Sequence, residues 1–215
     1  MAVVDDAQVE VALAGVNGVL AGAKPGILVV IHSTVLLETI KRLAASGEKI
    51  GVPVIDAPVS GGEAGARRKS LCYMVGGNPA LPERCRKLFS NSAAEIFHMG
   101  ELGCSAAAKM IVQVVTCINM LGAHEAERLA EKSSLNFSAL QKMLRKSSAQ
   151  SFVVDNWLDR FKLADDPMAI RKKRTAVFQK GLEPALEMAQ QLGLSLSGTE
   201  LVERILPRIM GIDNE

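Results

Sequence analysis

Hydrophobic positions follow two different patterns in the two halves of the chain. In the first hundred residues, two short β-branched runs, 27–32 and 51–56, flank a segment with the apolar spacing of a helix. This order is typical of a β-α-β unit with parallel strands. We predict further strands at 71–75 and 95–98. Helices are predicted from Asp5-Asp6 onward, from Ser33 or Thr34 to about 46, and from Asn78-Pro79 to 89.

Beyond Gly103 the strand signals stop, and apolar residues recur with helical spacing. The first and longest helix is predicted to run from about 104 to 132. Pro184 lies inside a later helical segment and is expected to kink or split it. Ser197 and Glu200 have the spacing of a capping box. The remaining helices are predicted at 135–144, 152–161, 167–192 and 201–210.

These patterns predict an α/β protein, in which an incomplete Rossmann-like parallel sheet leads through one long helix to an all-α C-terminal domain. We place the boundary between residues 1–103 and 104–215. An open parallel sheet needs several β-α-β units, and little more than one and a half are present. The sequence also has no G-x-G-x-x-G after a strand, which is the usual cradle for the pyrophosphate of a dinucleotide. We therefore expect the true start to lie upstream of Met1.

Composition and charge place the chain among ordinary globular proteins. Of its 215 residues 48% are hydrophobic, and the net charge of +2 argues against a nucleic-acid partner. The apolar run 110–123 is too short to span a bilayer, and Asp5-Asp6 stands where a signal peptide would be basic, so no membrane partner is expected. The scattered cysteines and histidines predict no metal site, no disulfide framework and a cytoplasmic location.

Lys109 is the one formal charge between residues 102 and 123 of the long helix. A cation in an apolar helix is costly unless it has a partner or a task. One reading is that its stem packs along the core while the ammonium reaches water. The other is a chemical role, in which Gln113, one turn later on the same face, would take part.

Ser60-Gly61-Gly62 follows the second strand as a turn. Its glycines permit close backbone approach to a ligand, and consecutive backbone amides there could hold a carboxylate. The alternative is a plain turn between a strand and a loop.

Four segments, in this order, resemble the β-hydroxyacid dehydrogenase family, which includes 3-hydroxyisobutyrate dehydrogenases and tartronate semialdehyde reductases and is related to 6-phosphogluconate dehydrogenase. They are His32-Ser-Thr34, Asp56-Ala-Pro-Val-Ser-Gly-Gly62, the G-x-x-G-x-x-x-x-x-K run from Gly100 to Lys109, and the segment Lys180–Gly193. The resemblance implies that residues 1–103 are part of a Rossmann-like NAD(P)-binding domain. It implies that residues 104–215 form a helical domain for substrate binding and dimerisation.

The resemblance also implies residue roles. Lys109 would be the acid/base in hydride transfer between a nicotinamide and a small hydroxy acid, and Gln113 stands where most of the family has asparagine. Gly181 stands where an aspartate is usual. The binding roles would fall to Ser60, Gly61 and Gly62 for the substrate carboxylate, to Ser33 and Thr34 for the nicotinamide end of the cofactor, and to Lys180 for closing the cleft.

Two functions therefore stay open at this point. One is a dehydrogenase that uses NAD or NADP, bound weakly or not at all because the Gly-rich cradle is missing. The alternative is a truncated, non-catalytic homologue that acts as an oligomeric helical module. Homo-oligomerisation is predicted for both, because the apolar faces of the helical half exceed what the α/β part can cover.

Overall fold

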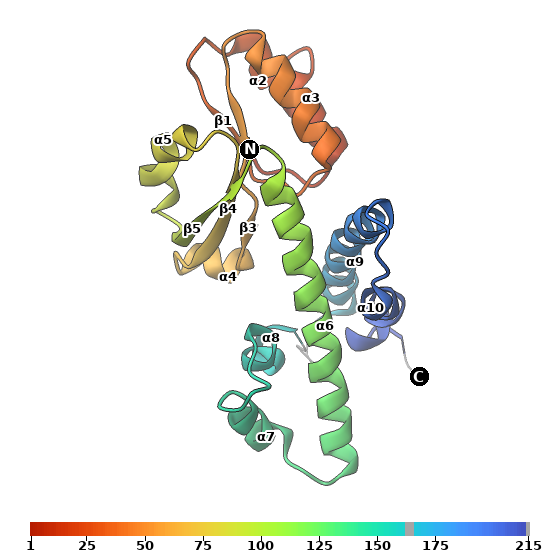
Figure 1. Cartoon of the computed structure of the whole chain (residues 1–215). Coiled ribbons are helices and arrows are strands. Elements are labelled where there is room, and N and C mark those ends of the chain that lie inside the picture. The colour runs from red at the N-terminus through yellow and green to blue at the C-terminus, as the bar shows by residue number, and fades with distance from the viewer. Residues whose placement is uncertain (162–165, 214–215) are drawn as a thin grey trace. The chain divides into compact units, whose positions relative to one another are not determined.

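The structure is a computed structural model that describes residues 1–161 and 166–213 (Figure 1). Contacts divide the chain into two units, Met1–Ile111 and Val112–Glu215. Helix α6 (Cys104–Lys132) begins in the first unit and ends in the second. The division between residues 103 and 104 into functional domains stays a prediction.

The first unit is built on a five-stranded sheet with the order β1-β2-β4-β3, in which β5 pairs with β4. The β1/β2 and β4/β5 pairs are parallel, whereas β4 is antiparallel to β2 and β3, because the chain returns from β3 directly through the short helix α4 (Gly62–Arg67). The predicted α/β class with parallel strands is confirmed, and the antiparallel pairs make the sheet mixed. The strands are β1 (Val29–Ile31), β2 (Val54–Asp56), β3 (Val59–Ser60), β4 (Leu71–Gly76) and β5 (Ala93–Gly100).

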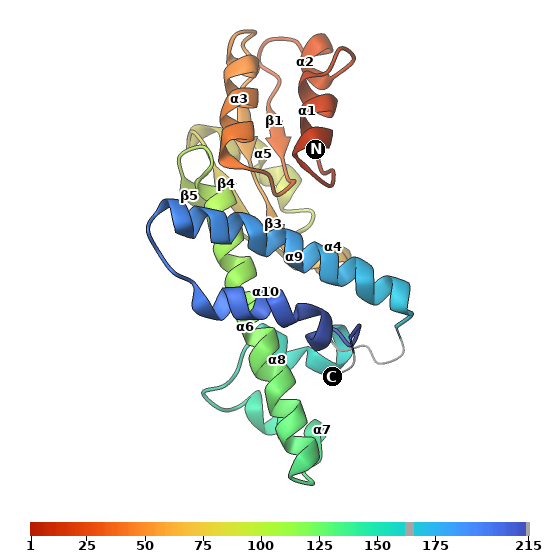
Figure 2. The same cartoon turned by 90° about the vertical axis from the view of Figure 1, so that its right-hand side faces the viewer.

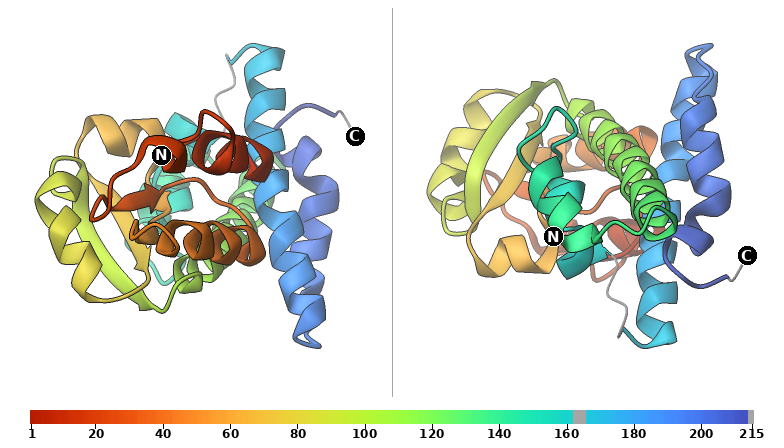
Figure 3. Two further views of the ribbon diagram at one scale, coloured as in Figure 1. Left: turned by 90° about the horizontal axis from the view of Figure 1, so that it is seen from above. Right: turned by 90° about the horizontal axis from the view of Figure 1, so that it is seen from below.

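Alternate side chains of the strands enter two cores, one on each face of the sheet. Val29 and Ile31 pack with α1 (Asp6–Ala14) and α3 (Leu37–Glu48), which lie side by side (Figure 3). Tyr73 packs on the other face with Phe89 of α5. The other helices of this unit are α2 (Val19–Gly22) and α5 (Ala80–Phe89).

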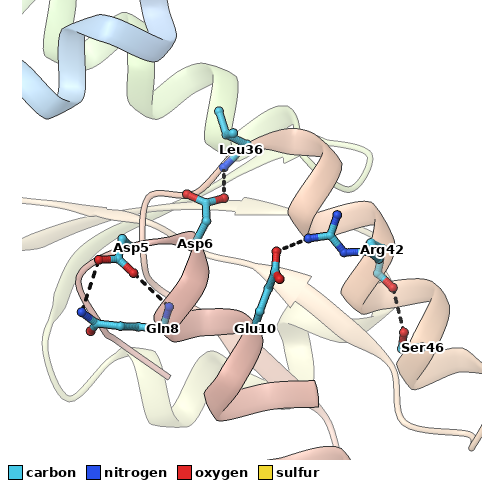
Figure 4. Close-up of polar contacts among 7 residues, drawn as sticks. All are labelled: Asp5, Asp6, Gln8, Glu10, Leu36, Arg42 and Ser46. Carbon is cyan, nitrogen blue, oxygen red and sulfur yellow. Dashed lines mark hydrogen bonds and ion pairs between the residues drawn. The ribbon is translucent and has the colours of Figure 1, made fainter. Parts of the chain in front are cut away.

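The start of α3 differs from the prediction. Ser33 does not cap this helix, because its hydroxyl donates to the carbonyl oxygen of Val3 and accepts from the Val3 N–H, both at 2.8 Å. Instead α3 begins at Leu37, and the Asp6 carboxylate accepts from the N–H of Leu36 at 2.9 Å (Figure 4). The acceptor at this helix start therefore comes from α1, far back along the chain, and no local pattern reveals it.

Among its described residues, the second unit forms helices and no strand, as predicted. Asn136 caps α7 with its side chain, which accepts from the N–H of Ala139. Helix α9 continues through Pro184 without being split. The predicted capping box was wrong, because α10 begins at Ser197 and its N-cap is Leu196, with no side-chain cap. The elements that follow α6 are α7 (Phe137–Leu144), α8 (Phe152–Asp155), a π-helical turn (Trp157–Phe161), α9 (Met168–Gln191) and α10 (Ser197–Ile209).

Trp157 lies at the centre of the core of the second unit and is fully buried. Its indole N–H donates to a carboxylate oxygen of Glu127 on α6 at 3.0 Å. Met120 of α6 and Leu182 of α9 belong to the same core, and α9 lies beside α10 (Figure 2). Among the described residues α6 is the one helix whose length and apolarity would allow it to cross a membrane, but its buried side belongs to this core.

Candidate active site around Lys109

Asp56, the last residue of β2, holds the N-terminus of α6. Its buried carboxylate accepts from the N–H of Gly103 at 2.9 Å and from the N–H of Ala106 at 3.2 Å. The hydroxyl of Ser105 donates to the same carboxylate. The first turn of a helix has backbone N–H groups without helical partners, and a carboxylate is the acceptor best suited to them. The start of α6 is thus fixed to the end of a central strand.

Lys109 follows one turn later on α6, partly buried. Its ammonium donates to the carbonyl oxygen of Val59 on β3 at 2.8 Å. Burial lowers the pKa of Lys109, because the charged form loses solvation. A lysine in this environment yields an unprotonated amine more readily than a lysine in water, which is the property that a general base requires.

The thiol of Cys72 is a neighbour of this ammonium. Burial and the carboxylate of Glu95 raise the pKa of Cys72, while Lys109 acts in the opposite direction. Cys72 in turn raises the pKa of Lys109, but burial is the larger of the two effects, so the pKa of Lys109 stays below its ordinary value. Cys72 also pairs with Ser60 across β3 and β4, so the thiol and the serine side chain share one face of the sheet.

The turn after Val59 has the backbone that the glycines were expected to allow. Gly61 has φ of 127° and Gly62 has φ of 61°, and both values favour glycine. A Cβ at Gly61 would also lie 3.0 Å from a methyl carbon of Leu71. Because Val59 directly precedes this turn, the structure brings Lys109 close to the predicted carboxylate-binding residues.

Ser33 and Thr34 follow β1, whose last residue Ile31 pairs with Asp56 at the end of β2. Ligands of α/β sheets bind outside the carboxyl ends of parallel strands, so these residues lie at the expected edge. The Ser33 hydroxyl is occupied by the backbone of Val3, so its predicted contact with a ligand would compete with two internal hydrogen bonds.

Gln113 and Lys180 lie in the second unit, on α6 and α9. Gln113 is partly buried and packs against Gly181, the residue after Lys180. The structure therefore brings Gln113 to the start of the Lys180 segment, within one unit.

Sequence reasoning missed two residues that shape this site. Asp56 lies in the motif from Asp56 to Gly62 but was assigned no role, and Gly76, directly after the predicted strand 71–75, was not singled out. A Cβ at Gly76 would lie 2.6 Å from the Asp56 Oδ1, so glycine is needed for the carboxylate to reach α6. One signal could have indicated Asp56. An acidic residue ends a predicted strand, and the start of the later helix α6 has no capping residue of its own.

Comparisons with known proteins agree with this arrangement. The family model for the NAD-binding domain of 6-phosphogluconate dehydrogenase matches residues 1–100. The model for the NAD-binding region of NADP-dependent 3-hydroxyisobutyrate dehydrogenase matches residues 103–211, about half of the chain. An uncharacterized oxidoreductase of Mycobacterium tuberculosis is 32% identical over 98% of this chain and 73% of its own length. The chain belongs to the β-hydroxyacid dehydrogenase family.

Other members of this NAD(P)-dependent dehydrogenase family are similar over comparable lengths. The 2-hydroxy-3-oxopropionate reductase of Escherichia coli is 31% identical over 94% of this chain and 68% of its own length. The crystal structure of a 3-hydroxyisobutyrate dehydrogenase from Salmonella typhimurium has the same fold, with a TM-score of 0.79 at 22% identity, over 96% of this chain and 71% of that one. The cofactor of the family, NAD or NADP, agrees with the sequence-based prediction.

The residues present fit one end of such a cofactor. Thr34 follows β1 at the edge formed by the carboxyl ends of β1 and β2, where ligands of α/β sheets bind. The sequence contains no Gly-rich loop for the pyrophosphate. The fit therefore concerns the reacting end, and Thr34 and the backbone after β1 would hold it.

Proposed function

We propose that this protein oxidises a small hydroxy acid, or reduces the corresponding carbonyl acid, with NAD or NADP as the hydride carrier. The observation that supports this proposal is the partly buried ammonium of Lys109, hydrogen-bonded to Val59 directly before the Ser60-Gly61-Gly62 turn. A base and a carboxylate grip side by side are what a hydroxy-acid dehydrogenase needs, since the hydroxyl must lose its proton while the acid group fixes the carbon.

In the proposed reaction, Lys109 reacts as the unprotonated amine. The amine nitrogen accepts the hydroxyl proton of the substrate, and the O–H electron pair forms the second bond of the new carbonyl group. The bound cofactor would supply the acceptor for the hydride that leaves the same carbon with both electrons of its C–H bond. In the reverse direction the Lys109 ammonium returns the proton to the carbonyl oxygen.

The remaining predicted residues would bind and orient the substrate. The amides and the hydroxyl of Ser60, Gly61 and Gly62 would hold its carboxylate, as an anion is held by a run of backbone N–H groups. The carboxamide of Gln113 would contact a polar substrate group, and Lys180 would help to close the cleft. Because the relatives are named for 3-hydroxyisobutyrate and 2-hydroxy-3-oxopropionate, a short-chain acid is the substrate class we propose.

The experiment compares wild-type protein with Lys109→Met and Lys109→Arg, using NAD and NADP and a panel of small 3-hydroxy acids. We expect Lys109→Met to lower kcat/KM by about 10²–10⁴-fold, the usual contribution of a general acid/base. Lys132→Met is the matched control, because Lys132 lies exposed at the other end of the same helix. Turnover that is unchanged in Lys109→Met would refute the assignment of the base, and no turnover in the wild type would favour the non-catalytic alternative.

We also propose that the chain forms homo-oligomers in the cytoplasm. On α6, Val115 is 54% exposed and Ile118 is 37% exposed, and both lie on one side of the helix. Exposed apolar residues in a row favour a protein partner, and a second copy presents the same row. Sedimentation velocity at micromolar concentration should show a species larger than a monomer, and a monomer throughout the concentration range would contradict this.

A further inference from the structure

Gln113 and Gly181 are in tight contact between α6 and α9. A Cβ added at Gly181 would lie 2.5 Å from the side-chain nitrogen of Gln113, 3.0 Å from its Cγ and 3.1 Å from its Cδ. Real Cβ atoms essentially never lie closer than about 3 Å to another atom. A larger residue at 181 therefore cannot fit while the Gln113 side chain keeps its present position. The glycine at 181 therefore leaves the space that the long side chain at 113 occupies.

Neither helix can retreat to relieve such a clash. Leu182, next to Gly181, is fully buried in the core of the second unit, and Cys117, one turn after Gln113, is buried in the same core. Rotation of the terminal carboxamide would not be enough, because the Cγ, which that rotation does not move, is also crowded. A side chain at 181 would thus displace the side chain of Gln113, and its terminal amide nitrogen would have to move most.

We infer that Gly181 is a positioning residue that sets where the carboxamide of Gln113 lies. Gln113 and Gly181 then form one matched pair between α6 and α9. The longer amide extends into space that a side chain at 181 would fill. This inference rests on the proposed function for its catalytic consequence, since Gln113 follows Lys109 by one helical turn.

A double-mutant cycle of Gly181→Ala and Gln113→Ala tests the contact without any enzyme assay. Urea unfolding is followed by the fluorescence of Trp157, which lies in the same core. Alanine normally favours a helix over glycine, yet we expect Gly181→Ala to lower the urea midpoint. In the Gln113→Ala background the same change should no longer destabilise, with a coupling of about tenfold in the unfolding equilibrium constant.

Gly122→Ala is the control, because a Cβ at this helical glycine of α6 would meet no atom within 4 Å. It should leave the urea midpoint unchanged or raise it, provided that its sedimentation matches that of the wild type. If Gly181→Ala stabilises as Gly122→Ala does, and the two changes of the cycle are additive, the inference is wrong whatever the activity of the protein.

The catalytic consequence has its own measurement. We expect Gly181→Ala to lower kcat/KM for the hydroxy acid, and Gln113→Asn, which shortens the amide, to restore part of it in the Gly181→Ala background. The rates are measured where circular dichroism shows every variant to be fully folded, so that recovered stability cannot account for the rescue. Failure of this rescue, while the unfolding cycle shows coupling, would overturn the catalytic part of the inference and leave the contact itself established.

Discussion

Replacing Asp56 by alanine would measure how strongly the start of α6 is held. In that variant the N–H groups of Gly103 and Ala106 would stay buried without their acceptor, and the hydroxyl of Ser105 would keep only its hydrogen bond to the main-chain carbonyl oxygen of residue 56. Each hydrogen bond to a charged group contributes about 1.5–3 kcal/mol, and loss of a helix N-cap alone costs about 0.5–2 kcal/mol. The three losses are not additive, because water can enter the space that the carboxylate leaves. We expect a loss of about 3–5 kcal/mol, out of a total stability of about 5–15 kcal/mol.

Asp56→Asn separates the loss of the acceptor from the loss of volume. The amide oxygen can still accept from the N–H of Gly103, but the amide nitrogen would face the N–H of Ala106, which is also a donor. The hydroxyl of Ser105 can rotate and accept, so one conflict remains. We expect about 1–3 kcal/mol for this variant, the usual cost of one unsatisfied buried group.

Urea unfolding followed by far-ultraviolet circular dichroism gives the free energies, and steady-state kinetics give the effect on Lys109, which lies one turn beyond Ser105. Asp6→Ala is the control, because Asp6 also accepts from a helix-start N–H, that of Leu36, but at an exposed position (Figure 4). It should cost about 1 kcal/mol or less. An Asp56→Ala protein that is no less stable than the Asp6→Ala protein would refute this account of how α6 is held.

Three further predictions concern the same site, two on pH dependence and one on a substitution. The kcat/KM for hydroxy-acid oxidation should rise with pH and level off below about 10.4, the ordinary pKa of lysine, because burial lowers the pKa of Lys109. Between that lowered pKa and the ordinary value the unfolded chain binds more protons, so wild-type stability should rise with pH in this window, and Lys109→Met should remove that rise in unfolding titrations. Gly76→Ala should cost about 1–3 kcal/mol in urea unfolding, because its Cβ would lie 2.6 Å from the Asp56 Oδ1, whereas Gly22→Ala, which meets no atom within 4 Å, should be nearly neutral.

Local signals predicted those elements whose caps lie beside them in the sequence. Asp5 opens α1 by accepting from the N–H of Gln8, Asn136 opens α7, and α6 extends to Lys132 as its apolar spacing indicates. The same reasoning failed for α3, whose helix-start acceptor is Asp6, thirty positions before Leu36. A pattern within a window of one or two turns contains no information about such a partner.

Pairing within the sheet was hard to predict for a related reason. The run 71–75 was correctly predicted as a strand, but the direction of its pairing depends on the route from β3 through α4. That helix has six residues, and two of them, Gly62 and Gly65, are glycines. Its helical propensity is therefore low, and the sequence did not indicate it. The site residues proposed around Lys109 were indicated by a family motif and not by periodicity, and their roles stay predictions.

Asp56 explains why these separate segments form one site. Its main chain ends β2 and leads directly to Val59, whose carbonyl oxygen accepts from Lys109, while its side chain holds the start of the helix on which Lys109 lies. Two connections therefore fix the position of the ammonium relative to the Ser60-Gly61-Gly62 turn. One is the main chain from Asp56 to Val59, and the other is the Asp56 side chain bound to the start of α6. Errors of about 1 Å in the placement of a catalytic group can cost about a hundredfold in rate. A buried carboxylate that fixes this distance from both sides would serve the proposed chemistry at Lys109, and it also gives the buried N–H groups at the start of α6 their acceptor.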